Sequence, residues 1–489
     1  MATKEITLKL MIHKEKNQIV YAESGNDFVD VLLSFLTMPL GTVIRLTGKQ
    51  SEMGSLHNIF RSVEDLDVQY LQTESCKNML LYPKSASEEH CRNLIVNIDD
   101  TEPTNYYLCN DGNVQPFGSI HHDFKHLISS FPDKKCRCGR SVERTILREK
   151  SMNAGDGKDG VFVKGKMRYM ITDDLQVLPV CMRTSLELLE RFGISDAAVL
   201  KERNVNLGQE EVLHLLKSSL LSKTPLTDVF LPMQHTIDEV TLGLKVKELD
   251  SKDMAHSHTE TEIGSNCRKM NVNLFVSKSR NKVLYAQVGE EFPDLLFSFL
   301  AFPLGSIVKC LGGCTSMGCL DDLYKSIKEL NKRWMKSEET KPLLLDPKLA
   351  PYFGSTNQLI QINELPGKLS TFACSNCYGI GVTDSGFGAC SHGNRKIQVE
   401  AINPKFRDVV TELGGAFMAG PGMFMVTEEL IVKPLSTISG ISFLSQFNIP
   451  ISDLEEQVVS VGEEEALSLL KASLISKTVL SDVFLKKPK

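Results

Sequence analysis

The chain contains one sequence pattern twice, and this internal repeat constrains its fold more than any other feature. A shift of 264 residues places residues 8–66 over residues 272–330, and the block Ser-Phe-Leu-x-x-Pro-Leu-Gly occurs in both stretches. A shift of 254 residues places residues 213–231 over 467–485, where 14 of 19 positions are identical. Chance does not produce matches of this length, so we predict two homologous modules in tandem.

The repeat also sets the domain boundaries that we expect. The first module extends over residues 6–232 and the second over residues 271–486. Residues 233–270 between them are polar and show little apolar periodicity, which is typical of a linker. Each module is long enough to bury a hydrophobic core of its own.

Each module opens with a pattern that predicts a hairpin, a helix and a strand. Apolar residues recur at helical spacing from Phe28 to Leu36, and Pro39 ends that helix. A strand is expected next, over residues 42–46 in the first module and 306–311 in the second, followed by another helix. This order predicts an α+β fold and suggests a ubiquitin-like topology. The opening hairpins are expected at residues 8–13 with 18–23, and at residues 272–277 with 283–287.

The end of each module predicts a strand–helix segment. In the first module a strand-like stretch covers residues 169–180, and a short helix is expected at residues 186–192. A longer helix then begins near Glu210 and Glu211, whose negative charges favour a helix N-terminus. We expect the apolar stripes of these helices to form the core.

The composition is that of an ordinary globular protein, with a net charge of −6 and 42% hydrophobic residues. Residues 1–10 lack the apolar segment of a signal peptide, and no stretch approaches the 18 or so apolar residues needed to span a bilayer. We therefore expect a cytoplasmic or nuclear protein that does not contact the membrane. The mild acidity argues against a general binder of polyanions.

The cysteines carry a chemical motif with a defined spacing. Thirteen cysteines, an odd number, favour reduced thiols or metal ligands over a disulfide framework. In the second module Cys374 and Cys377 form a Cys-x-x-Cys pair, and Cys390 and His392 follow it. Three thiols and one imidazole are a complete tetrahedral ligand set for zinc. The sequence therefore predicts a small zinc-ribbon-like insertion with a structural Zn²⁺ ion.

The first module contains part of the same ligand set. Cys109 corresponds to the first cysteine of the pair, and Cys136 and Cys138 correspond to Cys390 and His392. The second cysteine of the pair is replaced by Gly112, so three ligands remain. The fourth ligand is open between Asp111, a water molecule, and His121 or His122 of the longer loop; a site that binds no metal is a further alternative.

A redox role and the common catalytic motifs fit the sequence less well. A Cys-x-x-Cys pair is also the signature of thioredoxin, but Gly379 follows Cys377 closely and disfavours the helix that this chemistry needs. We find no His-Glu-x-x-His, Walker A, Gly-x-Ser-x-Gly or kinase motif. An enzyme therefore remains an alternative without an assigned reaction, and thiol redox chemistry is the least unfavourable version of it.

A basic segment surrounds the cysteines of the first module. Residues 134–150 contain seven Lys or Arg against two Glu. A basic zinc ribbon can hold phosphates, so nucleic-acid binding is an alternative function. A solvated surface is the simpler interpretation, because no aromatic residues are interleaved with these charges. The candidate nucleic-acid-binding residues are Arg137, Arg140, Arg144 and Arg148.

The sequence is similar to a plant family of uncharacterised proteins, the domain of unknown function 674. The resemblance rests on the block that begins at Ser34, on the Met-Gly-Cys stretch from Met317, and on both Lys-Thr-x-Leu-x-Asp-Val-Phe-Leu endings. It covers nearly the whole chain apart from the linker. It implies a soluble and often duplicated plant protein, and it brings no activity, substrate or catalytic residue. The cysteine pairs of the family match Cys374, Cys377 and Cys390, whereas Gly112 departs from them.

These observations favour a non-catalytic interaction or adaptor protein with at least one structural zinc site. The polar residues that both modules share are scattered and mostly explained by turns and caps, among them Asn17, Ser34 and Asp228. A protein partner is expected, and the sequence does not identify it. A cleft with strongly perturbed pKa values in both modules would instead favour an enzyme.

Overall fold

The structure is a computed structural model. It describes residues 5–48, 53–102, 104–109, 127–132, 134–136, 139, 141–146, 160–231, 268–374, 380–383 and 394–485. Helices and strands are mixed, as an α+β fold requires. Among the described residues, no helix combines the length and the apolar character that crossing a membrane requires.

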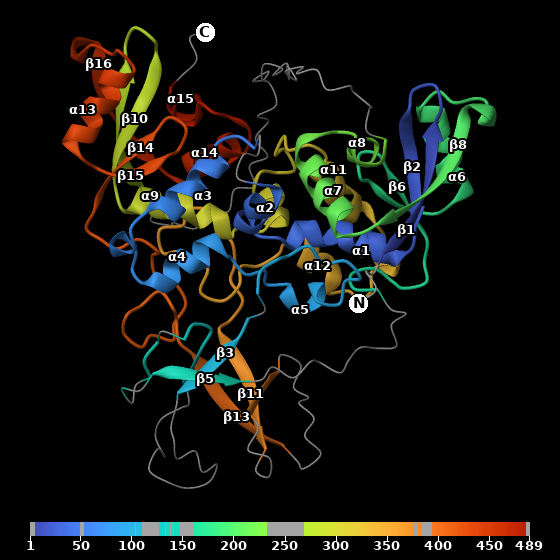
Figure 1. The fold of residues 1–489 in the computed structure, drawn as a ribbon, viewed down its shortest axis with the longest axis horizontal. Helices are drawn as coiled ribbons and strands as arrows, with labels where there is room; N and C mark the ends of the chain where they lie inside the picture. Colours follow the sequence, from blue (N-terminus) through green and yellow to red (C-terminus); the bar gives the residue numbers. More distant parts are fainter. Residues whose placement is uncertain are drawn as a thin grey trace, which may run out of the picture.

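Two five-stranded antiparallel sheets have the same strand order and lie at opposite ends of the upper part of the molecule (Figure 1). One contains, in spatial order, β7 (Val177–Pro179), β6 (Tyr169–Thr172), β2 (Gln18–Ser24), β1 (Ile6–His13) and β8 (Leu200–Leu207). The other contains β15 (Val432–Pro434), β14 (Met423–Thr427), β10 (Lys282–Gly289), β9 (Met270–Ser277) and β16 (Leu454–Val461). The predicted opening hairpins are therefore confirmed as β1–β2 and β9–β10.

Most of the helices lie between or below these sheets, whereas α6 and α13 pack on the outer faces of the sheets (Figure 1). Those from the first half of the chain are α1 (Asn26–Ser34), α2 (Leu40–Thr47), α3 (Leu56–Asp65), α4 (Glu74–Leu81), α5 (Glu88–Cys91), α6 (Met182–Arg191), α7 (Gln209–Leu221) and α8 (Pro225–Phe230). Those from the second half are α9 (Glu291–Ser298), α10 (Leu304–Cys310), α11 (Leu320–Glu329), α12 (Thr340–Leu345), α13 (Thr437–Gln446), α14 (Glu463–Ile475) and α15 (Val479–Phe484). The short and long helices predicted near the end of the first module are confirmed as α6 and α7.

The strand predicted after the first helix of each module is wrong, because residues 42–46 lie in α2 and residues 306–310 lie in α10. The β-branched Thr42, Val43 and Ile44 favour a strand by propensity. All three are nevertheless buried, so the segment has no solvent face that would distinguish a period of two from a period of 3.6. The hairpin–helix–strand order on which the ubiquitin-like topology rested does not hold.

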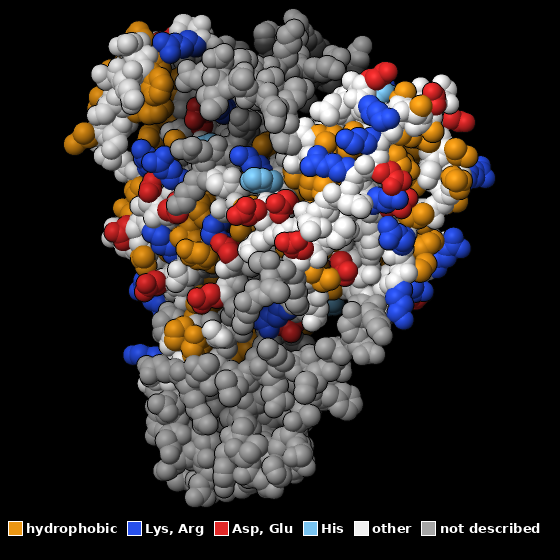
Figure 2. Space-filling view, turned by 45° about the vertical axis from the view of Figure 1, so that its right-hand side comes forward, with side chains coloured by type: hydrophobic (Ala, Val, Ile, Leu, Met, Phe, Trp, Pro, Cys, Tyr) orange, Lys and Arg blue, Asp and Glu red, His pale blue; other side chains and the backbone are white. Residues whose placement is uncertain are grey.

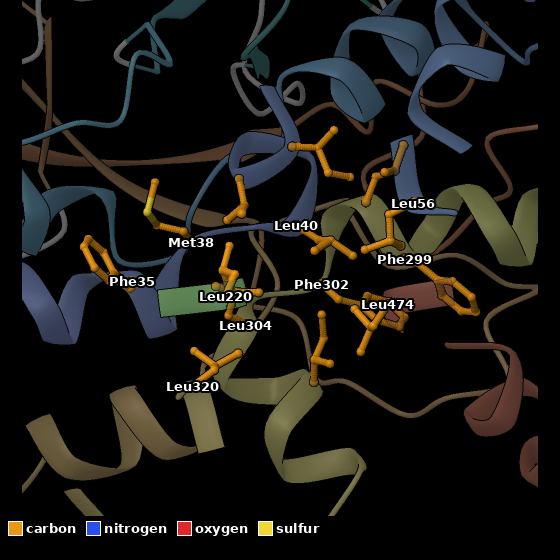
Figure 3. Close-up of a cluster of buried hydrophobic side chains, with 14 of the residues drawn as sticks. Phe35, Met38, Leu40, Leu56, Leu220, Phe299, Phe302, Leu304, Leu320 and Leu474 are labelled. Carbon is orange, nitrogen blue, oxygen red and sulfur yellow. The ribbon is translucent and has the colours of Figure 1, made fainter. Parts of the chain in front are cut away.

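The two halves of the chain cross at the centre of the molecule. The N–H of Leu40 donates to the carbonyl of Phe302 (2.9 Å), and the N–H of Leu304 donates to the carbonyl of Met38 (3.0 Å). Buried side chains from both halves surround this crossing (Figure 3). They belong to one hydrophobic core that extends through both halves; the labelled members are Phe35, Met38, Leu40, Leu56, Leu220, Phe299, Phe302, Leu304, Leu320 and Leu474.

Beyond this crossing, the helices of the first half pack against the second sheet. The Nδ2 of Asn58 on α3 donates to the carbonyl of Glu429 (2.8 Å), and the hydroxyl of Ser62 accepts from the N–H of Val432 (2.9 Å). Figure 1 shows α3 beside β15 and α9, with α4 packed next to α3. The helix α1, before the crossing, contacts β1 and β2 of its own half.

The reciprocal contact connects the second half to the first sheet, where α11 lies against β7. Loops of the two halves also pair: the N–H of Lys336 donates to the carbonyl of Phe162 (3.0 Å), as the N–H of Gln72 donates to that of Phe417 (2.9 Å). Each sheet therefore contacts a helix of the other half in addition to the helices of its own half. The module boundaries at 6–232 and 271–486 stay a prediction, and the described residues of the two segments are interleaved.

Two glycines permit close contact between the backbones of the two halves. Gly54 and Gly318 have positive φ angles of +45° and +40°. A Cβ at Gly54 would lie 2.4 Å from the carbonyl oxygen of Ser473, and one at Gly318 would lie 2.3 Å from that of Ser219. These carbonyls belong to α14 and α7. Each helix can lie this close to the other half of the chain because the residue that it meets there is a glycine.

A third, six-stranded sheet lies at the bottom of Figure 1 and draws strands from both halves. Its order is β12 (Ile380–Thr383), β11 (Lys368–Cys374), β13 (Asn394–Ala401), β4 (Leu127–Ser129), β3 (Tyr106–Cys109) and β5 (Val142–Ile146). β13 and β4 join the two halves as a parallel pair, with Glu400 opposite Leu127. The edge strands β12 and β5 approach each other to a Cα separation of 8 Å or less, so the sheet curls strongly.

Candidate functional site

A cleft of about 820 Å³ lies where the helical body meets the third sheet. Residues 82–107 form one wall, residues 350–367 from the other half form the opposite wall, and the ends of β4 and β13 contribute as well. The cleft therefore exists only because both halves of the chain meet here. Its lining contains six aromatic side chains, which are Tyr82, Tyr106, Tyr107, Phe131, Tyr352 and Phe353.

Arg45, on α2, does not line the cleft but holds residues of the first wall in place. Its Nε donates to both carboxylate oxygens of Asp100 (3.1 and 3.2 Å), and its Nη1 donates to the carbonyl of Leu81 at the end of α4 (2.8 Å). Its Nη2 reaches the hydroxyl of Thr101 (3.0 Å), and its guanidinium lies 4.9 Å from the centre of the Tyr82 ring. One planar cation thus positions a carboxylate and an aromatic ring of the cleft.

Glu88, on α5, is held by a second set of contacts. Its carboxylate accepts from the N–H of Thr104 (3.0 Å) and from the hydroxyl of the same residue (2.7 Å), and it pairs with Arg92. Burial opposes ionisation, but the Thr104 hydrogen bonds and the charges of Arg92 and Lys84 outweigh it and lower the pKa of Glu88. Arg92 also pairs with Glu89 (3.0 Å).

Lys84 is the one lysine among the described residues that line the cleft. Burial lowers its pKa, although Glu88, Asp99 and Glu102 oppose that shift. Its ammonium donates to the backbone carbonyl of Glu102. This contact ties the wall together across the loop between α4 and β3.

Tyr352 fixes the opposite wall in an uncommon backbone conformation, with φ at +73°. Its N–H donates to the carboxylate of Glu364 (2.9 Å), and its hydroxyl donates to the carbonyl of Ala401 at the end of β13 (2.8 Å). A Cβ on Gly367 would lie 2.3 Å from the Tyr352 hydroxyl oxygen, so the ring needs glycine there. The hydroxyl thereby links this wall to the third sheet.

A buried charge cluster supports that wall. The ammonium of Lys405 donates to the carbonyls of Gly354 and Gly415 and lies 4.2 Å from the centre of the Phe417 ring. Burial lowers the pKa of Lys405 to about 8, while the nearby charges of Asp294 and Glu364 oppose this. Lys405 is fully buried and is absent from the lining of the cleft, so we assign it a structural role.

Most of the predicted zinc ligands lie outside the described residues, namely Cys138, Cys377, Cys390 and His392. The backbone of Cys109 ends β3 opposite Val142, and that of Cys374 ends β11 opposite Asn394. Both predicted ligand positions therefore lie at strand ends of the third sheet. The fourth-ligand candidates Asp111, His121 and His122 also lie outside the described residues.

Cys136 is the predicted ligand whose side chain the structure describes. It is a half-buried free thiol that packs beside Leu127, Val142 and Ile402. Where side chains are described, no group of three or more His, Cys, Asp or Glu residues is arranged to hold a metal ion. The zinc prediction stays a prediction.

The structure describes one of the four residues of the predicted basic patch, and only its backbone. The backbone of Arg144 lies in β5, opposite Leu108 of β3, whereas Arg137, Arg140 and Arg148 lie outside the described residues. In the described part of the face shown in Figure 2, Lys and Arg side chains alternate with Asp and Glu. That described surface carries charges of both signs.

Sequence reasoning missed the cleft because its lining comes from separate segments. Tyr106 and Tyr107 stand next to each other shortly before Cys109, and this aromatic pair is the one local signal that could have drawn attention to the region. Arg45, Glu88 and Tyr352 belong to no motif and become neighbours of the cleft only through the fold.

Comparison with known proteins assigns no chemistry to this site. A family model described as Protein of unknown function (DUF674) matches residues 2–464. No curated protein and no solved structure matches the chain.

Proposed function

The chain belongs to the family described as Protein of unknown function (DUF674), which assigns no reaction, and from the geometry of the cleft we propose a non-catalytic protein that binds a small molecule. The observation that carries this proposal is the cleft itself. Its volume of about 820 Å³ lies in the range of 300–1,000 Å³ that is usual for ligand sites. Such sites are largely apolar with a few fixed polar groups, and the six aromatic rings together with the anchored Asp100 and Glu88 provide this combination.

The walls are held in place without a ligand. Arg45 fixes the loop that carries Asp100, Thr104 fixes Glu88, and Ala401 fixes the hydroxyl of Tyr352. Because these groups are already ordered, a ligand would lose little of its binding free energy in organising them.

The titratable groups of the lining favour binding over catalysis. Glu88 is held by Thr104 and Arg92 and its pKa is lowered, so it is ionised and engaged at neutral pH. Asp100 is bound to Arg45, and Lys84 donates to a carbonyl. A general acid or base needs a pKa near the working pH and freedom to reach the substrate, and these three groups do not combine both properties.

The test is a thermal-shift screen of diverse small molecules against the wild-type protein and three variants. Ala86→Trp would fill the cleft from a half-buried position, and Tyr82→Ala would remove an aromatic side chain from its wall. Phe447→Ala would remove a similarly exposed aromatic residue elsewhere (45% against 51% for Tyr82). We expect ligands that stabilise the wild-type protein and Phe447→Ala but bind the two cleft variants at least tenfold more weakly. Ligands that bind Ala86→Trp unchanged would refute the site.

A second candidate function, protein interaction, is supported by α13. This helix contains no charged residue and exposes Ile438 (77%) and Ile441 (66%), and Ile451 beyond it is 79% exposed. The corresponding helix α6 instead carries four charged side chains, Arg183, Glu187, Glu190 and Arg191. Exposed apolar side chains that gather on one element are typical of an interaction surface.

The neighbouring edge strand suggests the kind of partner. β16 is an edge strand of its sheet. The N–H of Lys278 donates to the carbonyl of Asp453 (3.0 Å), so Asp453 and every second residue after it form the hydrogen bonds to β9. By antiparallel alternation, the backbone N–H and C=O groups of Glu456 and Val458 point away from β9. Because Glu455 and Glu456 are exposed beside the apolar surface, we propose that an extended partner segment with apolar and basic side chains adds to β16.

This second candidate can be tested with a labelled peptide that alternates Val and Lys. We expect its fluorescence anisotropy to rise with the wild-type protein and with Asn204→Pro, the corresponding change in β8. Val458→Pro removes an outward N–H from β16 and should abolish the rise. Equal binding by Val458→Pro, or equal binding of a Val–Glu peptide, would refute this mode.

The zinc site is also retained as a proposal. It is supported by the ligand spacing of Cys374, Cys377, Cys390 and His392. Elemental analysis of the purified protein should find one or two zinc ions per chain, and the double variant Cys377→Ser, Cys390→Ser should lose one. A protein without zinc would leave these cysteines as free thiols.

Nucleic-acid binding stays the alternative, on the basic segment alone. It predicts an affinity that falls steeply with salt and that is lost when Arg140, Arg144 and Arg148 are neutralised. An affinity that does not change with salt would exclude it.

A further inference from the structure

We infer that the cleft takes an uncharged aromatic molecule that carries hydroxyl groups. This inference rests on the proposed binding function and names the chemical class of the ligand. It follows from three properties of the lining: its aromatic content, its balance of charges, and the hydrogen-bond acceptors that it exposes.

The aromatic content of the cleft is far above that of the chain. Four of the ten tyrosines of the protein line it, together with two phenylalanines. These rings come from both walls and from the end of β4, so they face the space from several sides. Tyrosine offers an apolar ring face for stacking and a polar hydroxyl tip, which suits a ligand that is itself aromatic and polar.

The charge balance disfavours an anionic ligand. Among the described residues that line the cleft, four carboxylates stand against the one ammonium of Lys84; these acids are Glu88, Glu89, Asp100 and Glu102. The guanidinium groups of Arg45 and Arg92 are engaged with three of these acids. Lys84 already donates to a carbonyl, and burial lowers its pKa. In the described part of the lining, a phosphate or sulfate would therefore meet carboxylates without a cation that is available to hold it.

The polar groups at the mouth of the cleft favour a ligand that donates hydrogen bonds. Asn78, Glu102 and Asn105 are exposed lining residues whose side-chain oxygens can accept. Hydroxyl groups donate to carboxylate and amide oxygens without introducing charge. An uncharged hydroxylated ring thus satisfies the apolar and the polar parts of the lining together, whether or not it carries a sugar.

The inference can be tested with three probes that share one ring: 4-methylumbelliferone, its β-glucoside and its phosphate. Binding to the full chain is measured by calorimetry in mildly acidic buffer, in which the phenol is uncharged. We expect the phenol or the glucoside to bind at least tenfold more tightly than the phosphate. Ala86→Trp should weaken that binding tenfold or more, and Phe447→Ala should leave it unchanged.

The outcomes separate the ligand class from the binding function. Equal or tighter binding of the phosphate overturns the class and leaves the cleft as a ligand site. If none of the probes binds while the broader screen yields a ligand that Ala86→Trp excludes, the class is again wrong and the function stands. A screen in which no ligand responds to Ala86→Trp overturns both. Tighter binding of the glucoside than of the phenol would identify a glycosylated ligand within the inferred class.

Discussion

The buried carboxyl of Asp30 should make the protein lose stability as the pH rises. The hydrogen bonds of this carboxyl alone would suggest the opposite dependence on pH. Asp30 lies on α1, is 2% exposed, and accepts from the N–H groups of Val161 (2.8 Å), Phe162 (2.7 Å) and Val163 (3.0 Å). These bonds fasten the chain where it returns from the third sheet. Asp294 makes the equivalent bonds to Phe417 (2.7 Å) and Met418 (3.0 Å).

Burial is the larger effect on Asp30, and it raises the pKa of the carboxyl from 3.8 to about 6 although the three N–H donors oppose it. The folded state therefore holds the proton more tightly than the unfolded state. The resulting stabilisation is complete below about pH 3.8 and is lost as the pH rises through about 6. The difference in pKa corresponds to about 3 kcal/mol.

The variant Asp30→Asn tests this reasoning, because it keeps the shape of the side chain and removes the titration. Its amide nitrogen would face the N–H of Val161, and one lost buried hydrogen bond costs about 1–3 kcal/mol. Below about pH 3.8 we expect the free energy of unfolding of the variant to be lower than that of the wild-type protein by about that amount. Above about pH 6 the gap should close or reverse, since only the wild-type chain loses stability there.

The measurement is urea unfolding at several pH values, with Asp65→Asn on the exposed end of α3 as a control for the change in charge. The difference between wild type and Asp30→Asn should shrink by about 3 kcal/mol over the range, and the control difference should stay flat. A gap that widens as the pH rises would show that the N–H donors outweigh burial and that the pKa of Asp30 is low.

Two further predictions concern the exchange of helices and an exposed thiol. Gly54→Ala should destabilise the protein by several kcal/mol in thermal unfolding, because its Cβ would lie 2.4 Å from the carbonyl of Ser473, whereas Gly25→Ala has open space and should change little. Cys181 is exposed ahead of α6, and hydrogen bonds from the backbone N–H groups of the first turn lower its pKa. It should react with iodoacetamide faster than the exposed Cys314, as measured by mass spectrometry of the peptides, and equal rates would contradict the assignment.

The sequence predicted elements in which polar residues mark a period. In β1 polar and apolar residues alternate, and in α1 Asp30 and Ser34 interrupt the apolar run at helical spacing, although both are buried. In α2 the buried Thr42, Val43 and Ile44 are β-branched, and β propensity gave the wrong answer. This wrong prediction falls at the crossing of the two halves, where the other half of the chain helps to bury α2.

The candidate site was less predictable than the fold, since it depends on contacts that no local pattern encodes. Periodicity shows which face of α3 is buried but not which sheet buries it. Tyr82 and Tyr352 come to line one cleft because the two halves exchange helices and share a sheet. The cysteine spacings were visible in the sequence, yet most of the predicted ligands lie outside the described residues, so their geometry adds nothing to the prediction.

The exchange makes a strong prediction about the two halves expressed separately. In residues 1–232 alone, α3 would lose its contacts with α9 and β15 and keep those with α2 and α4. In the whole chain its side chains Leu56, Ile59, Phe60 and Val63 are buried. Burial of one such side chain contributes about 1.5–3 kcal/mol, so exposing two of them would cost about 3–6 kcal/mol. This is a large part of the stability of about 5–15 kcal/mol that is usual for a domain.

We therefore expect neither residues 1–232 nor residues 271–489 to unfold cooperatively as an isolated monomer. Mixed together, the two fragments should form a one-to-one complex, because α3 of the first contacts β15 of the second and α11 of the second contacts β7 of the first. Sedimentation velocity and thermal unfolding of the fragments, alone and mixed, would measure this. A folded monomer of residues 1–232 with its own sharp transition would show that each half can retain its own helices, and the exchange would then be a consequence of joining the halves in one chain.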